Sequence, residues 1–253
     1  MQFIDDAEFQ INIDLDQGAR IASLIWRDMQ FTLPFRGTPV NYGWYGMGPW
    51  AGRVRDGVLM FRGLQYELPL RLAPNALHGT VLDVEWTVVE QQAAKLTMTC
   101  DLGIDWPFAG TVTHVIDVVD GDVLFTLTLD ALEPQPAQVG WHPWFLPPRH
   151  SHHNFTAMLQ KDVSGITTNQ RVPVPHRKYD DCFVKPITMP WLTIGEVKVE
   201  ISSDCSHWVI YNANPAGICF EPQSGPPNGI NTEPYVVMPG KPLVRHMAIT
   251  RIS

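Results

Sequence analysis

Three features of the sequence predict an all-β fold, either a sandwich or a barrel. Hydrophobic and polar residues alternate in many short runs, which is the period of strands that bury one face. The 22 prolines and 19 glycines are spread along the chain and interrupt helices. Turn signals recur at short intervals, and no segment keeps a helical period over three turns. We therefore expect one all-β domain over residues 1–253, since all-β domains reach this length.

The expected strands follow from alternation and from the turns between them. In the first half of the chain they cover residues 9–15, 19–26, 58–61, 64–68, 84–88, 95–100, 111–119 and 123–129. Arg62-Gly63 and Asp120-Gly121 join two pairs of these runs, and both dipeptides suit the two-residue turns of β-hairpins. Later strands are expected over residues 197–201, 208–211, 218–220 and 243–252.

Composition and charge exclude several classes of protein. The net charge is −8 and no basic cluster offers a footprint for a phosphate backbone, so no nucleic-acid partner is expected. No apolar run approaches the roughly 20 residues that span a bilayer, so no membrane partner is expected. The first residues lack the basic and apolar regions of a signal peptide, which predicts a cytoplasmic protein. The four cysteines show no CxxC spacing and are interpreted as free thiols.

Residues 139–148 surround one histidine with aromatic side chains. His142 lies between Trp141 and Trp144, and two prolines end the segment. We interpret it as a stiff loop that holds an imidazole in one orientation for proton transfer near neutral pH. Flat aromatic faces beside it suit the apolar C–H faces of a sugar ring. The alternative is a buried histidine bonded to a backbone carbonyl, with tryptophans that belong to the core.

Three further polar islands interrupt the expected strands. Arg53 lies in residues 49–57, where an arginine can fork two hydrogen bonds to a ligand or simply lie in a solvated loop. His78 lies between small residues in 75–79, and a site histidine and a turn histidine are equally consistent with that pattern. Glu221 ends an apolar run and precedes a proline. A glutamate is rarely buried without a partner or a task, so a functional role is favoured there.

Two other groups are ambiguous. Histidines 150, 152 and 153 invite a metal-binding interpretation, but no carboxylate or cysteine lies beside them, and a solvated loop is favoured. Three aromatic residues are consistent either with a sugar site or with the core of a sandwich: Trp44, Tyr45 and Trp50.

Taken together, the islands resemble the aldose 1-epimerase (galactose mutarotase) family. The resemblance rests on an ordered set of motifs: Gly52-Arg53, Leu77-His78-Gly79, His142-Pro143-Trp144-Phe145, Asp180-Asp181-Cys182-Phe183 and Glu221-Pro222-Gln223. It covers residues 45–225, with Pro239-Gly240 similar to a C-terminal proline-glycine of the family. The resemblance implies a large antiparallel β-supersandwich that interconverts the α and β anomers of a free aldose.

The resemblance also implies roles for individual residues. Glu221 matches the general base that takes the proton of the anomeric hydroxyl, and His142 matches the general acid that protonates the ring oxygen. His78 matches a second catalytic histidine near the ring oxygen. The substrate-binding residues implied are Arg53, Asp180, Trp144 and Gln223, and Asp181 is an alternative to Asp180. These roles imply a bell-shaped pH dependence, with the acidic limb from Glu221 and the basic limb from His142.

The implied chemistry moves one proton off the sugar and one onto it. A carboxylate and an imidazolium suffice for this, so no cofactor and no metal is expected, and the expected partner is a small-molecule sugar. The sequence contains neither GxGxxG nor a ligand cluster of zinc spacing. Two departures from the family put the identity of the sugar in question: Gly52 replaces the usual asparagine, and Trp144 replaces the usual tyrosine.

Three rival functions stay open. A hexose-6-phosphate 1-epimerase needs a further basic group near the far end of the sugar, which Arg55, Arg62 or Arg71 could supply. A non-catalytic sugar-binding module on the same fold is favoured only if the acid or the base is missing. A glycoside hydrolase would use Glu221 and Asp180 as its carboxylate pair. The sequence gives no indication of the oligomeric state.

Overall fold

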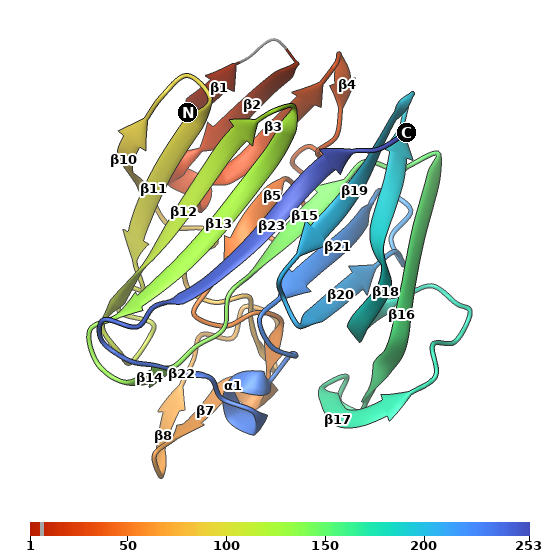
Figure 1. The fold of residues 1–253 in the computed structure, drawn as a ribbon. Helices are drawn as coiled ribbons and strands as arrows, with labels where there is room; N and C mark the ends of the chain where they lie inside the picture. The colour runs from red at the N-terminus through yellow and green to blue at the C-terminus, as the bar shows by residue number, and fades with distance from the viewer. Residues whose placement is uncertain (6–7) are drawn as a thin grey trace.

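The computed structural model describes residues 1–5 and 8–253 and shows two layers of antiparallel strands packed face to face (Figure 1). The first layer consists, in order of pairing, of β1 (Gln2–Asp5), β2 (Phe9–Asp14), β3 (Arg20–Trp26), β5 (Trp44–Met47), β15 (Gly140–Phe145), β21 (Ile218–Gln223), β20 (His207–Tyr211) and β18 (Asp180–Ile194). The second consists of β10 (Thr87–Gln91), β11 (Lys95–Asp101), β12 (Gly110–Val119), β13 (Asp122–Ala131), β23 (Leu243–Arg251), β19 (Val197–Ser203) and again β18. The long strand β18 therefore belongs to both layers.

Shorter elements extend the two layers. Strand β16 (His150–Lys161) pairs with β18 and carries β17 (Thr167–Val172), and β4 (Met29–Gln30) pairs with β3. The small pairs are β6 (Arg53–Val54) with β9 (Ala76–Leu77), β7 (Val58–Phe61) with β8 (Leu64–Glu67), and β14 (Gln135–Pro136) with β22 (Val236–Val237). The helical segments are the 3₁₀ turns η1 (Leu15–Gln17) and η2 (Arg55–Gly57) and the α-helix α1 (Gly229–Thr232). In Figure 1, β7, β8 and α1 lie below the sandwich.

The two predicted hairpins form at their predicted turns. Arg62 and Gly63 join β7 to β8 with φ of 51° and 80°, and Asp120 and Gly121 join β12 to β13 with φ of 53° and 83°. Positive φ at both central residues gives the turn a twist that matches the twist of the flanking strands. The local sequence is therefore enough to fix these registers.

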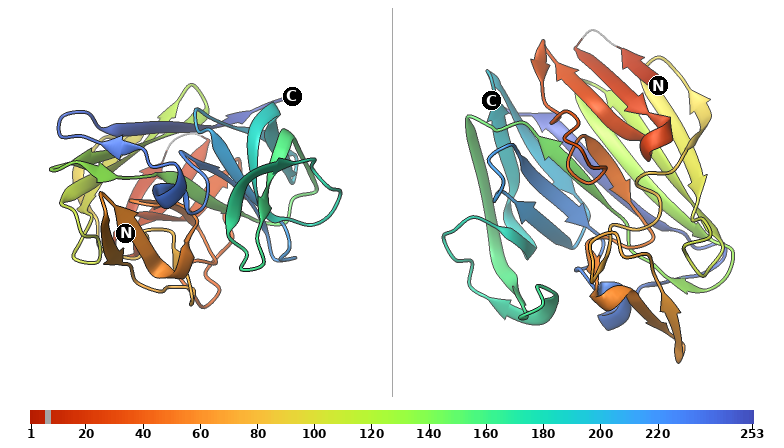
Figure 2. Two further views of the ribbon diagram at one scale, coloured as in Figure 1. Left: turned by 90° about the horizontal axis from the view of Figure 1, so that it is seen from below. Right: turned by 180° about the vertical axis from the view of Figure 1, so that it is seen from behind.

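The core lies between the two layers and is built from alternate residues of each strand. Figure 2 shows β2 and β3 in front when the molecule is seen from behind, whereas β12, β13 and β23 are in front in Figure 1. Side chains from both layers meet between them: the ring centroids of Trp44 on β5 and Phe125 on β13 are 6.2 Å apart. The predicted all-β fold is confirmed, and the layered antiparallel arrangement matches the supersandwich that the resemblance implies.

Several local predictions are wrong. Residues 140–145 form the strand β15 rather than a stiff loop, and residues 150–154 begin β16 rather than a solvated loop. The strand expected from residue 84 begins only at Thr87, and β21 continues through Pro222 to Gln223. In β15, β16 and β21 the pairing with neighbouring strands overrides the local signals of proline and polar residues. Before Thr87, the backbone of Val84 and Trp86 instead forms hydrogen bonds with the turn at Leu15 and Gly18.

Candidate active site

The outer face of the first layer carries the histidine and the glutamate singled out in the sequence. Trp141 points into the core, where its Nε1 donates a hydrogen bond to His114 Nε2 of the second layer at 3.2 Å. His142 is the next residue on β15, so its side chain points to the opposite, outer face. The pairing of Gly140 with Gln223 and of Trp144 with Cys219 sets His142 directly opposite Glu221.

The strand registers align further side chains with this pair. Two rows of neighbours cross the outer face because alternate residues of paired strands share one face. The first row contains Tyr45, His142, Glu221, Val209 and Cys182, and the second contains Trp144, Cys219, Tyr211 and Asp180. Residues remote in the sequence thus become adjacent through register alone.

Loops above this face add Arg53 and His78. The two-residue strands β6 and β9 place Arg53 opposite Leu77, next to His78. The Asn228 backbone N–H, at the start of α1, donates a hydrogen bond to the Arg53 carbonyl oxygen at 2.6 Å. The backbone of Gly52 has φ of 70°, and a Cβ there would lie 2.9 Å from the Pro227 ring. The close approach of this proline favours glycine at this position, where the resemblance implies asparagine.

All seven residues that the sequence singles out line one cavity of about 530 Å³: Arg53, His78, His142, Trp144, Asp180, Glu221 and Gln223. This volume lies within the range of small-molecule sites. The expected convergence of Arg53, His78, His142, Asp180 and Glu221 on one concave site is therefore present. Trp44, Tyr45 and Trp50 instead belong to the buried core.

The centre of the cavity wall is a buried pair of acid–base groups. His142 Nε2 lies 3.4 Å from Glu221 Oε1, and both side chains are less than a tenth exposed. The imidazole is stacked between Tyr45 and Trp144, with ring centroids 4.9 and 5.5 Å away. Gln223 Nε2 donates a hydrogen bond to Glu221 Oε2 at 3.2 Å and orients the carboxyl group. The pair is thus fixed in place before any ligand arrives.

Burial favours the uncharged forms of both groups. Desolvation raises the pKa of Glu221 well above its usual range, and the nearby Asp180 raises it further. Desolvation lowers the pKa of His142, and the Arg20 cation acts in the same direction. The pair therefore holds one proton, mainly on the carboxyl group, over a wide pH range.

His78 faces His142 from the loop side. Its ring is perpendicular to that of His142, with centroids 5.0 Å apart. Burial and then His142 lower the pKa of His78 well below its usual value, so His78 is neutral at neutral pH. A neutral imidazole can donate one hydrogen bond and accept another, which suits a sugar hydroxyl.

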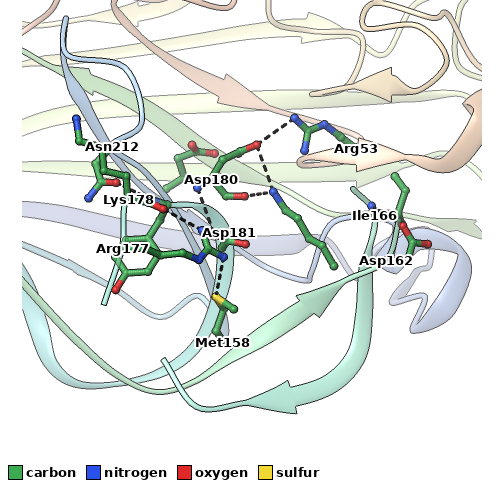
Figure 3. A network of polar contacts seen from close by, with 12 residues as sticks. Arg53, Met158, Asp162, Ile166, Arg177, Lys178, Asp180, Asp181 and Asn212 are labelled. Carbon is green, nitrogen blue, oxygen red and sulfur yellow. Dashed lines mark hydrogen bonds and ion pairs between the residues drawn. The ribbon is translucent and has the colours of Figure 1, made fainter. Parts of the chain in front are cut away.

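Asp180 joins two cations at the edge of the cavity (Figure 3). Arg53 Nη2 and Lys161 Nζ each lie 3.2 Å from Asp180 Oδ2. Burial alone would raise the pKa of Asp180, but the charges of Lys161 and Arg53 outweigh it and hold that pKa below its usual value. Asp181 is engaged elsewhere, 2.7 Å from Arg177 Nη1, which supports Asp180 as the residue that faces a ligand.

A buried cation lies behind the acid–base pair. Arg20 is fully buried, and its guanidinium lies 4.3 Å from the ring centroids of both Tyr42 and Tyr45. It donates hydrogen bonds to the carbonyl oxygens of Tyr42 and Leu82 at 2.6 and 3.0 Å. Because Tyr45 also stacks on His142, the order Tyr42, Arg20, Tyr45, His142, Trp144 forms one continuous stack, which we call the Arg20 stack.

Sequence reasoning misses several residues of the site. Cys219 has a signal, since it lies on a predicted strand two residues before Glu221. Tyr211 has a weaker signal, as the last residue of another predicted strand. Lys161 and Arg20 carry no such signal, because Lys161 ends an unpredicted strand and Arg20 has an ordinary position in a predicted one. Of the three arginines proposed to bind a phosphate group, Arg71 lines the cavity, whereas Arg55 and Arg62 do not. Arg55 forms an ion pair with Asp162.

Histidines 150, 152 and 153 do not line this cavity and lie on both faces of β16. The ring of His152 stacks on Trp191 with centroids 5.7 Å apart, and His153 packs beside Tyr179 at 5.4 Å. A different group has metal-ligating atoms within 4.8 Å of one another: His142, Cys219 and Glu221. No helix in the described ranges is long and apolar enough to cross a membrane.

Comparisons with known proteins agree with this geometry. The model of the family described as aldose 1-epimerase matches residues 3–250. A curated Escherichia coli (strain K12) protein named YihR, described as uncharacterized, is 24% identical over 249 residues, which cover 85% of this chain and 81% of that protein.

Solved structures share the fold at low sequence identity. A putative aldose 1-epimerase from Escherichia coli K12 superposes with a TM-score of 0.84 at 17% identity, covering 99% of this chain and 98% of the other. A GalM/aldose epimerase homologue from C. elegans superposes with a TM-score of 0.85 at 14% identity, covering 99% and 98%. A family match over nearly the whole sequence, together with this fold, shows that the chain belongs to the aldose 1-epimerase family.

Proposed function

We propose that this protein is a mutarotase that interconverts the α and β anomers of a free aldose, with Glu221 and His142 as its acid–base pair. The observation that carries the proposal is the 3.4 Å contact between His142 Nε2 and Glu221 Oε1 in the wall of the cavity. The anomeric hydroxyl oxygen and the ring oxygen are bonded to the same carbon. An acid and a base that act on both oxygens must therefore lie next to each other, as these two groups do.

In the proposed reaction the pair needs one proton in total. With that proton on His142, the Glu221 carboxylate takes the proton of the anomeric hydroxyl while the imidazolium protonates the ring oxygen. The bond between C1 and the ring oxygen then breaks, which leaves an open-chain aldehyde. At this point the carboxyl group is protonated and the imidazole neutral, the distribution that burial favours. Rotation about C1–C2 and the reverse transfers close the ring as the other anomer.

Other residues of the cavity wall hold the sugar in the proposal. Arg53 and Asp180 are ion-paired at the edge of the cavity and present charged donors and acceptors to hydroxyl groups. Trp144 Nε1 donates a hydrogen bond to the Val40 carbonyl oxygen at 2.8 Å, which fixes its ring as a flat apolar wall. His78, neutral and buried, is the second histidine near the ring oxygen in this arrangement.

The test is the rate of anomer exchange, measured by saturation-transfer NMR across a panel of aldoses. Glu221→Gln keeps the shape of the side chain but removes the base, and His142→Asn keeps a donor but cannot deliver a proton. Each should lower turnover by about 10²-fold or more, the range for positioned acid–base groups. Sugar binding should largely persist, because the other wall residues remain.

Matched substitutions on the surface control for the change of residue type. Glu196→Gln and His152→Asn alter residues outside the cavity and should exchange anomers at the wild-type rate. Wild-type rates in both Glu221→Gln and His142→Asn would overturn the mechanism. A wild-type protein that accelerates no aldose would favour a binding module, and cleavage of a nitrophenyl glycoside would favour a hydrolase.

Exchange of a 6-phosphorylated aldose is a second candidate, favoured by the charge around the cavity. Arg53, Arg71 and Lys161 all line it. Arg71 pairs with Asp83, while Arg53 and Lys161 share Asp180. Two cations thus share the single carboxylate of Asp180, which suits an anionic substituent. If the substrate is phosphorylated, Arg71→Met should raise KM for the phosphorylated sugar more than for the free one.

A further inference from the structure

A cysteine thiol lies next to the acid–base pair and forms with it a group of three potential metal ligands. Cys219 lies two residues before Glu221 on β21 and points to the same face. The ligating atoms of His142, Cys219 and Glu221 lie within 4.8 Å of one another, and all three residues are buried. Imidazole nitrogen, thiolate sulfur and carboxylate oxygen are the three ligand types that zinc takes from proteins.

The spacing of the three atoms is close to that of a metal site. A point equidistant from atoms at most 4.8 Å apart lies roughly 2.8 Å or less from each. Zinc bonds to nitrogen, oxygen and sulfur are about 2.0–2.3 Å long, so each ligating atom needs to move closer to the metal by about 0.5–0.8 Å at most. Because the three residues lie on two paired strands, small side-chain rotations supply that movement without a change of backbone.

The charges of such a complex balance. A divalent cation would displace the thiol proton of Cys219 and the proton that His142 and Glu221 share, and both protons would leave to solvent. The thiolate and the carboxylate then carry two negative charges against the two positive charges of the metal, with a neutral imidazole as third ligand. A neutral complex is the form that a buried site tolerates best.

The group has an open side. His142 and Glu221 line the cavity, and Cys219 is completely buried beside them on the same face of the sheet. A cation can therefore enter from the cavity, and its fourth position faces the space that a sugar would fill. Three protein ligands with one open position are the arrangement of zinc sites that bind an exogenous ligand.

We propose that His142, Cys219 and Glu221 form a binding site for a thiophilic divalent cation of the Zn²⁺ class, and that occupation of this site switches off the acid–base pair. A metal uses the lone pair of the imidazole and the oxygen of the carboxylate, so neither group can transfer a proton to or from a sugar. Cation binding stands on the geometry alone, whereas the loss of anomer exchange also rests on the proposed function.

The test of binding uses Co²⁺ as a spectroscopic probe on the full chain, free of any polyhistidine tag. A thiolate bound to Co²⁺ gives a charge-transfer band in the near ultraviolet, which histidines and carboxylates alone do not give. We expect this band in the wild type and its disappearance when Zn²⁺ is added. Cys219→Ser should abolish the band and raise the Kd for Co²⁺ at least tenfold.

Cys182→Ser is the matched control. Cys182 is also buried, also lines the cavity and belongs to the row of His142 and Glu221, but it is not part of the three-residue group. This variant should keep the band and the affinity. A wild type without the band, or a band that depends on Cys182 rather than Cys219, would overturn the proposal. If Cys219→Ser does not fold, Cys219→Ala and the wild-type titration decide the same question.

A second measurement separates this proposal from the proposed function. Zn²⁺ should suppress anomer exchange in the wild type, a chelator should restore it, and Cys219→Ser should need at least tenfold more Zn²⁺ for the same suppression. A cobalt band in a protein that exchanges no sugar contradicts the mutarotase and leaves the metal site standing. Exchange that is insensitive to Zn²⁺, at metal concentrations that saturate the band, overturns the inhibitory role.

Discussion

At the scale of single residues, the pair His142 and Glu221 titrates as one unit. Below its acidic limit the pair gains a second proton and has no base, and above its basic limit it loses the last proton and has no acid. When the pair gains the second proton, His142 becomes charged, and burial opposes this by lowering the pKa of His142. When the pair loses the last proton, Glu221 becomes charged, and burial opposes this by raising the pKa of Glu221. We therefore expect the acidic limb from His142 and the basic limb from Glu221, whereas the resemblance alone implies the reverse assignment.

The expected result is a kcat/KM profile that is flat through the neutral range, with both limbs far from it. Anomer exchange measured as a function of pH on the wild type checks this. A narrow bell with limbs near the ordinary values of about 4.3 for glutamate and 6.5 for histidine would show that the two groups are not desolvated in the free protein.

The Arg20 stack gives a second prediction at this scale. Arg20 lowers the pKa of His142 through a single intervening ring, that of Tyr45. Arg20→Met removes the cation, so the pKa of His142 should rise and the acidic limb of kcat/KM should move to higher pH. Arg20→Lys keeps a charge at nearly the same place and should move the limb less. An acidic limb that stays in place in Arg20→Met would mean that the arginine serves only the packing of Tyr42 and Tyr45.

At the scale of elements, the loop that carries His78 depends on a glycine. A Cβ at Gly79 would lie 1.9 Å from the Gly48 carbonyl oxygen, and φ there is 81°. Gly103 has a similar φ of 78° with nothing within 4 Å. Gly103→Ala should therefore lower the free energy of unfolding only by the cost of placing alanine in the left-handed conformation, about 1–2 kcal/mol. Gly79→Ala adds a backbone clash and should lower the free energy of unfolding by at least about 2 kcal/mol more.

Urea unfolding of the two variants measures the difference. Equal losses would show that the segment around Gly48 moves away freely. Anomer exchange of Gly79→Ala should also fall, because His78 precedes the displaced residue, whereas Gly103→Ala should leave exchange unchanged.

The elements that could be predicted are those with local signals. The hairpins at Arg62-Gly63 and Asp120-Gly121 are set by two residues each, and the alternation of β12 and β13 needs no knowledge of other strands. The sequence does not predict strands β16 and β18, because polar runs and Pro186 obscure the alternation of polar and apolar residues. These two segments are strands because they pair with each other. The sequence predicts a loop at β15 for a different reason: all six of its residues are buried, so no alternation of polar and apolar residues is visible.

The sequence predicts the central members of the candidate site, but not their arrangement and not all of their neighbours. His142 and Glu221 stand out as polar residues in apolar surroundings, but that they face each other follows from the register of β15 and β21. Lys161 and Arg20 come close to the site only because of the way the chain folds. The sequence alone therefore gives no reason to assign these two cations, rather than other lysines or arginines, to the site.

At the scale of the whole molecule, a histidine between the two layers links stability to pH. His114 is buried, and desolvation lowers its pKa to about 3. The unfolded imidazole takes up a proton below about 6.5, whereas the folded one does so only near 3. Its contribution to stability is therefore complete above about pH 6.5 and is lost as the pH falls.

His114→Gln should reduce the dependence of the free energy of unfolding on pH by about 1.4 kcal/mol per pH unit within that window. Urea unfolding at several pH values measures the slope. Trp141→Phe removes the hydrogen bond to His114 but keeps the imidazole, so it should lower stability and keep the slope. An unchanged slope in His114→Gln would mean that the folded protein protonates His114 as readily as the unfolded chain does.

The alternation along β15 also restricts how proteins of this kind can diversify. Trp141 serves the core and His142 the cavity, so inserting or deleting one residue in this strand would exchange their faces and spoil both at once. Heritable changes in substrate preference are therefore expected to accumulate in the segments that connect the strands, such as those around β17, rather than in the length of β15. A laboratory that wishes to redirect this scaffold to another ligand should build its libraries in those segments and leave the strand lengths untouched.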